Sequence, residues 1–137
     1  MMVDAAVREF VRQRAGDRCE YCRLPQHAGD ATFHVEHILA QQHSPQGAEA
    51  PDNLALACQR CNLHKGPNLS SVDPMSGDVV PLFHPRRDQW QEHFELRVAL
   101  ILGRTPTGRA TVQLLQVNAR RRVELRASLI ADGSFDT

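Results

Sequence analysis

The sequence predicts an α+β fold held together by a four-cysteine metal site, with a C-terminal β-hairpin and two helices packed on this core. Three observations predict it: two Cys-x-x-Cys pairs, a β-branched and aromatic segment between them, and two segments of helical periodicity near the C-terminus. A chain of 137 residues suits one compact domain, since it buries roughly two thirds of its unfolded surface. We therefore expect a single domain over 1–137, with a core at 17–66 and an extension at 73–137.

The composition is that of an ordinary globular protein, with 42% hydrophobic and 23% charged residues. The formal net charge is zero, so any attraction to nucleic acid must come from local clusters such as the arginines at 120–122. No apolar run approaches the roughly 20 residues that cross a bilayer, and the first residues lack the apolar core of a signal peptide. The sequence thus predicts a cytoplasmic protein with no membrane partner.

An amphipathic helix is expected over 3–15, because its apolar residues recur at spacings of three and four, at Val3, Val7, Phe10 and Val11. Asp4 is placed to cap the start of this helix, and Gly16 is placed to end it. The helix leads the chain into the first cysteine pair.

The segment that follows predicts a strand, a long loop and two short elements. Residues 32–39 are β-branched and aromatic, which favours a strand, whereas 41–52 contain Ser, Pro and Gly without periodicity and predict a loop. The short apolar segment 53–57 fits either a strand or a helical turn. Residues 62–66 indicate a helical turn that stops at Gly66.

The extension after residue 73 predicts two strands and two helices. We expect strands at 79–83 and 94–102 that pair antiparallel, with Trp90 in the core between them. A Thr-Pro pair, suited to the cap and first turn of a helix, opens a helix at 105–117. Its core-facing residues are Val112, Leu114 and Leu115. A second helix is expected at 119–131, with an apolar stripe of Val123, Ala127 and Ile130.

The four cysteines form two pairs, Cys19 with Cys22 and Cys58 with Cys61, separated by the 35 residues 23–57. Structural zinc is usually held by four ligands in a tetrahedron, and each Cys-x-x-Cys unit supplies one edge of it. Iron, free or redox-active thiols and disulfides are the alternatives, and the absence of a signal peptide disfavours disulfides. A closed four-thiolate site has no open position, so this zinc is expected to be structural.

Three strings lie inside and around this cysteine frame, in the order Glu36-His37-Ile38, Asp52-Asn53-Leu54 and Cys58-Gln-Arg-Cys61-Asn62-Leu-His-Lys65-Gly66. Together they resemble the HNH endonucleases, many of which carry a ββα-metal (His-Me finger) motif inside a four-cysteine clamp. The resemblance covers 17–66 and implies a ββα-metal core. It departs from the usual pattern in having Glu where Asp is commoner, which bears on the geometry and identity of the metal.

The resemblance implies a role for each residue of the motif. His37 is the expected general base, and an imidazole is suited to this because it is mostly neutral above its pKa near 6.5. Asn53 is expected to orient the His37 ring through its backbone or side chain. Glu36 and Asn62 are the expected ligands of a catalytic divalent cation, Mg²⁺ or another such as Mn²⁺ or Ni²⁺, which binds through oxygen atoms.

Three further residues and one run of arginines have less specific assignments. His64 is a possible extra metal ligand, or an exposed polar residue on a helical turn. Lys65 is placed to contact a phosphate. His34 would share the strand face of Glu36, as an ordinary strand histidine or as support for the ligand. The arginines 120–122 are either solvated or in contact with the DNA backbone.

The resulting hypothesis is a metal-dependent HNH endonuclease that hydrolyses phosphodiester bonds of DNA, with no small-molecule cofactor. Two alternatives remain open: a zinc-stabilised nucleic-acid-binding module without catalytic activity, and a zinc domain that binds proteins. The sequence leaves the oligomeric state undetermined.

Overall fold

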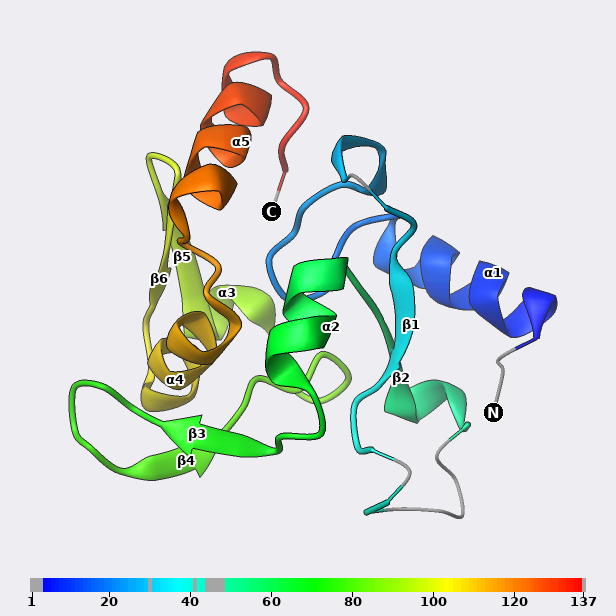
Figure 1. Ribbon diagram of the computed structural model, residues 1–137, viewed down its shortest axis with the longest axis horizontal. Coiled ribbons are helices and arrows are strands. Elements are labelled where there is room, and N and C mark those ends of the chain that lie inside the picture. Colours follow the sequence, from blue (N-terminus) through cyan, green and yellow to red (C-terminus); the bar gives the residue numbers. More distant parts are fainter. Residues whose placement is uncertain (1–3, 30, 41, 44–48, 137) are drawn as a thin grey trace.

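The computed structural model describes residues 4–29, 31–40, 42–43 and 49–136, and it confirms the α+β fold (Figure 1). The described strands form three two-stranded antiparallel sheets. In chain order the elements are α1 (Ala5–Ala15), β1 (His34–His37), β2 (Leu54–Ala57), α2 (Gln59–Lys65), β3 (Ser70–Val72), β4 (Val79–Pro81), α3 (Trp90–His93), β5 (Phe94–Arg97), β6 (Leu100–Gly103), α4 (Pro106–Leu115) and α5 (Arg120–Ala131), with 3-10 turns at Gln26–Ala28 and Pro51–Asn53.

Helix α1 confirms the predicted first helix within the described residues; Val3 lies outside them. The Asp4 carboxylate accepts a hydrogen bond from the Val7 backbone N–H at 2.9 Å, and Gly16 ends the helix at φ 64°. Val11 is fully buried, while Phe10 remains half exposed beneath the Arg14 guanidinium. The buried face of α1 packs against β2.

Strands β1 and β2 and helix α2 form the ββα unit at the centre of the chain (Figure 1). Strand β1 is shorter than the strand predicted at 32–39. The segment 53–57, for which the sequence left two possibilities, forms the end of a 3-10 turn and then strand β2. Their register places Glu36 opposite Ala55 and His37 opposite Leu54. Of the predicted loop 41–52, residues 41 and 44–48 lie outside the described part.

The predicted pairing of 79–83 with 94–102 is wrong. Strand β4 instead pairs with β3, across a turn that begins at Asp73, and 94–102 folds back on itself as β5 and β6. Val98 adopts φ 56° at the β5–β6 turn, a conformation that β-branched residues rarely occupy. That disfavoured turn residue concealed the hairpin from sequence reasoning.

Helix α4 confirms the prediction at its start, since the Thr105 hydroxyl accepts a hydrogen bond from the Gly108 backbone N–H at 3.0 Å. The predicted stripe of α5 is wrong: Ala127 and Ile130 are exposed, whereas Arg126 and Leu129 are buried. Arg126 faces inward because its guanidinium donates at 2.6 Å to the carbonyls of both Ala99 and Val117. These two hydrogen bonds therefore hold the face of α5 that carries Arg126 toward the protein interior.

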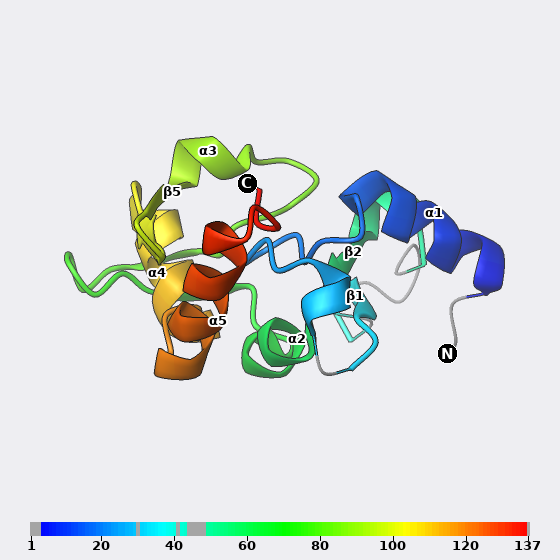
Figure 2. The same cartoon turned by 90° about the horizontal axis from the view of Figure 1, so that it is seen from above.

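The extension packs on the ββα unit through a shared core, visible where α2 and α4 lie close together (Figures 1 and 2). Trp90 is buried, as predicted, and its indole N–H donates to the Tyr21 carbonyl at 2.8 Å, beside the first cysteine pair. Phe83 and Phe94 pack with their ring centroids 5.1 Å apart in the same core. Across the residues that the structure describes, no helix is long and apolar enough to cross a membrane.

Candidate active site and metal centre

The four cysteine sulfurs form one buried cluster in which all Sγ atoms lie within 4.8 Å of one another. The Sγ atoms of Cys22 and Cys58 are 3.8 Å apart. That distance exceeds the roughly 2.05 Å of a disulfide and equals the edge of about 3.8 Å of a tetrahedron with Zn–S bonds of about 2.3 Å. The cluster therefore fits one structural zinc ion.

Backbone N–H groups support the cluster from both knuckles. The Cys22 N–H points at Cys19 Sγ and the Cys61 N–H at Cys58 Sγ, each at 3.5 Å, as the tight Cys-x-x-Cys turns require. Hydrogen bonds from the neighbouring thiols, and then the charge of Arg122, hold the pKa of Cys58 below its usual range. These contacts favour the thiolate of Cys58, the form that binds a metal, whereas burial raises the pKa of Cys19.

Arg122 lies against the zinc cluster. Its guanidinium donates to Cys58 Sγ at 3.1 Å, which offsets part of the charge of four thiolates around Zn²⁺. Of the predicted run 120–122, Arg120 has a side chain that is 92% exposed and pairs with Glu124 one turn later on α5. The structure therefore turns Arg122 to the protein interior instead of toward a DNA backbone.

The first knuckle is tied to β2 by a buried carboxylate. Glu20 accepts a hydrogen bond from the Leu56 N–H at 2.8 Å, and its own N–H donates to the Leu56 carbonyl at 2.9 Å. The second carboxylate oxygen of Glu20 pairs with Arg86, which comes from the loop before α3. Burial lowers the pKa of Arg86 to about 10, with a smaller contribution from the charge of Arg14. Through Glu20 and Arg86, the first Cys-x-x-Cys turn is therefore connected both to strand β2 and to the C-terminal extension.

Three of the predicted site residues line one open cleft of about 550 Å³: Glu36 and His37 from β1, and Asn62 from α2. The remaining lining residues are Ala40, Gln42, Gly66 and Pro67. The antiparallel register and the packing of α2 on β1 bring these side chains together from two parts of the chain.

Asn53 fixes the backbone that leaves β1. Its side-chain oxygen accepts from the Leu39 N–H at 2.8 Å, its amide donates to the Leu39 carbonyl at 2.9 Å, and its own carbonyl accepts from the Ile38 N–H at 2.8 Å. The two residues after His37 are therefore held in one position. Asn53 therefore constrains the end of β1, the strand that carries the His37 imidazole.

The contact to the His37 ring comes from a residue that sequence reasoning did not single out. Glu49 Oε1 lies 2.7 Å from His37 Nε2, and both side chains are partly exposed. Glu49 sits in the aperiodic segment 41–52, where no spacing or composition signal marks it.

Glu36 is buried against Lys65. The ammonium of Lys65 lies 2.7 Å from Glu36 Oε1 and donates to the Ile38 carbonyl at 2.9 Å. Burial raises the pKa of Glu36, and the Lys65 charge opposes part of the rise. This inward position of Lys65 differs from the phosphate contact that the sequence predicts. Glu36 Oε2 and the buried Tyr21 hydroxyl make no hydrogen bond of good geometry among the described residues, but the two groups lie near enough that Tyr21 lowers the pKa of Glu36 and Glu36 raises that of Tyr21, each beside the larger effect of burial.

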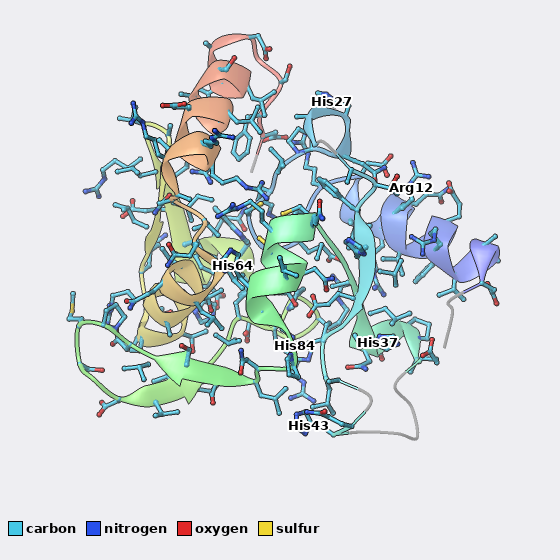
Figure 3. All side chains as sticks on the ribbon, in the orientation of Figure 1. Arg12, His27, His37, His43, His64 and His84 are labelled. Carbon is cyan, nitrogen blue, oxygen red and sulfur yellow. The ribbon has the colours of Figure 1, made fainter. Side chains whose placement is uncertain are left out.

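The other candidate histidines lie away from the cleft. His64 does not line it, because two residues of helical rotation separate His64 from Asn62, and Figure 3 shows it on the α4 side of α2. His34 is exposed at the start of β1. The structure therefore gathers Glu36, His37 and Asn62, supports them with Asn53 and Glu49, and leaves out His64.

Comparisons with known proteins match the segment that carries the cysteines and the cleft residues. Residues 19–68 match the family model for HNH endonuclease, and this range contains the cysteine frame and the cleft residues. The chain is also similar to the Septu protein PtuB of Bacillus thuringiensis, with 25% identity over 125 residues, covering 91% of this chain and 46% of that relative. The chain thus spans about half the length of this curated relative. No solved structure matches the chain significantly.

Proposed function

We propose that this chain, whose residues 19–68 match the family model for HNH endonuclease, is a metal-dependent endonuclease that hydrolyses phosphodiester bonds of DNA. The observation that carries the proposal is the cleft in which Glu36, His37 and Asn62 meet. It combines a candidate base with two oxygen donors, which are the groups that phosphodiester hydrolysis with a divalent cation requires.

The donor set of the cleft fits a hard divalent cation. Glu36 offers a carboxylate whose Oε2 atom makes no hydrogen bond of good geometry among the described residues, and Asn62 offers an amide oxygen across the cleft. Mg²⁺ and its analogues prefer such oxygen ligands and retain several waters, so two protein ligands suffice. When bound, the cation polarises the phosphate and stabilises charge on the leaving oxygen. Lys65 must share Glu36 with it or move away.

In this proposal His37 takes the proton of the attacking water on a ring nitrogen. Asn53 positions the segment that carries His37, through its three hydrogen bonds to Ile38 and Leu39. Glu49 restrains the ring itself. Positioning of this kind matters because a misplacement of about 1 Å can cost about a hundredfold in rate.

We assign the four-cysteine cluster to a structural Zn²⁺. Its sulfurs are buried on all sides and offer no open coordination position, so its role is to hold the two knuckles and not to contact substrate. Four unpaired thiols also fit the reducing cytoplasm, the location that the sequence predicts.

The test is cleavage of supercoiled plasmid by the purified zinc-loaded protein with Mg²⁺, Mn²⁺ or Ni²⁺. We expect nicked or linear product, and a loss of about 10² to 10⁴ in rate for His37→Ala, the range for removal of a general base. His27→Ala, an exposed histidine outside the cleft, is the matched control. Equal rates for wild type and His37→Ala with every metal would exclude the nuclease.

One observation favours the alternative of a nucleic-acid-binding module without catalysis: the buried carboxylate of Glu36 already has a cation, Lys65, 2.7 Å away. Titration of the zinc-loaded protein with Mn²⁺ separates the two proposals. The endonuclease binds one Mn²⁺ weakened by Glu36→Gln, whereas the binding module binds none beyond zinc.

A further inference from the structure

A second groove, of about 740 Å³, adjoins the cleft along one segment of chain, since Leu39 lines the groove while His37 and Ala40 line the cleft. Its floor includes Leu39 and Asn53, the pair that fixes the His37 strand. Its walls come from outside residues 19–68: Arg14 on α1, and the loop between β4 and α3, which supplies His84, Pro85, Arg86 and Arg87. Figure 2 shows this loop reaching from α3 toward β2. Ala50 and Asp52 complete the lining.

The groove is cationic despite the neutral chain. Three guanidinium groups line it together with one exposed carboxylate, Asp52, whereas burial lowers the pKa of His84 and so disfavours a charge on that imidazole. Arg14 and Arg86 lie close enough for the charge of Arg14 to contribute to the lowered pKa of Arg86. The Nε atoms of both arginines are buried without a hydrogen-bond partner among the described residues. An anion in the groove would relieve this crowding of positive charge.

Two of these arginines already make contacts that stabilise the fold. Arg14 donates to the carbonyls of Pro51 and Leu54, at 3.0 and 2.6 Å, and Arg86 pairs with Glu20. Arg87 differs, because its side chain is exposed and forms no ion pair within the described part of the chain. The groove therefore consists of a rigid positive wall, built by Arg14 and Arg86, with one unengaged guanidinium at its rim.

We propose that this groove binds the phosphate backbone of the DNA strand beside the scissile bond, with Arg87 as a direct phosphate contact. The proposal rests on the proposed function for the identity of the nucleic acid. A guanidinium suits this role because its donors match the geometry of phosphate oxygens. A strand seated in the groove would pass over Leu39 and Asn53 and so enter the cleft at His37. The extension then has a function: it supplies the backbone contacts that the ββα unit lacks.

The test measures DNA binding separately from cleavage. A fluorescent duplex is titrated with His37→Ala protein, without added divalent cation, at several salt concentrations, and then with His37→Ala/Arg87→Ala. Loss of one phosphate contact should weaken binding about fivefold near 0.1 M salt and reduce the slope of log affinity against log salt by about one. Arg120→Ala in the same background is the matched control, since it removes an exposed arginine on α5.

The outcomes separate this proposal from the nuclease itself. If Arg87→Ala and Arg120→Ala bind alike, or if the parent binds no DNA, the groove proposal is overturned even when the wild type cuts plasmid. If Arg87→Ala alone weakens binding and flattens the salt dependence, the groove proposal stands even when the wild type cuts nothing.

Discussion

Lys65 Nζ lies 2.7 Å from Glu36 Oε1, and the two side chains are only 3% and 5% exposed. This buried ion pair holds the side chain of Glu36, the candidate cation ligand on β1, against that of Lys65 on α2. Each charge is compensated by the other, because burial otherwise disfavours the ionised carboxylate. The pair links the last turn of α2 to β1, the two elements that carry Asn62, Glu36 and His37 of the cleft.

Lys65→Met is therefore expected to lower the free energy of unfolding by about 3 kcal/mol, the typical cost of removing one partner from a buried pair. Urea unfolding of the zinc-loaded protein measures it. In Glu36→Gln/Lys65→Met no unpaired charge remains, so the double variant should lose less than the sum of the two single variants. Additive losses would show that the two groups are not coupled.

The zinc assignment predicts one zinc per chain by elemental analysis and its loss in Cys58→Ser. Structural zinc contributes on the order of 10 kcal/mol of apparent binding free energy, comparable to the whole stability of a small domain. Cys58→Ser should therefore be largely unfolded by circular dichroism. Arg60→Ala changes an exposed residue on the same helix and should keep both zinc and fold. A folded, zinc-free Cys58→Ser protein would contradict the assignment.

Features encoded in a few neighbouring residues were predictable from the sequence. The Cys-x-x-Cys spacing predicted the sulfur cluster, and the Asp4 and Thr105 caps predicted the starts of two helices, because each depends on contacts within one turn. The strings around Glu36 and Asn62 predicted a shared site, because their resemblance to HNH endonucleases carried the tertiary arrangement with it.

Features that depend on which distant residues pack together were not predictable. The partner of β4 is β3, at a distance of one turn, although 94–102 looked equally suitable as a strand. Glu49 contacts His37 across a loop without periodicity, and Lys65 turns inward because Glu36 needs a buried counter-charge. In each case the sequence carries the chemical group, and the packing decides where it points.

Asn53→Ala is expected to reduce plasmid cleavage by about a hundredfold, because the segment after His37 loses both side-chain hydrogen bonds to Leu39. Zinc content should not change. The chain offers a closely matched control in Asn118, whose amide makes the same pair of bonds to the Ile101 backbone, at 3.0 and 2.8 Å, in the extension. Asn118→Ala should lose similar stability and keep its cleavage rate well below the unfolding temperature. Equal rates for the two variants would remove the positioning role from Asn53.

The Asp73–Arg109 pair predicts a pH dependence of stability. Asp73 begins the β3–β4 turn and receives two guanidinium hydrogen bonds from Arg109 on α4, both at 2.9 Å, which hold the pKa of Asp73 well below its usual range. A depressed pKa means that the pair stabilises the fold above the unfolded-state pKa of about 3.9 and loses this contribution as pH falls through the folded-state value. Asp73→Asn should therefore melt at a lower temperature than wild type at pH 6 to 7, and the difference should shrink below about pH 4. Comparing the two proteins at each pH cancels the shared loss of zinc in acid. Asp78→Asn, on the exposed side of the same turn, is the control, and its difference in melting temperature from wild type should not shrink at low pH. If the difference for Asp73→Asn stayed constant with pH, that result would contradict the pairing.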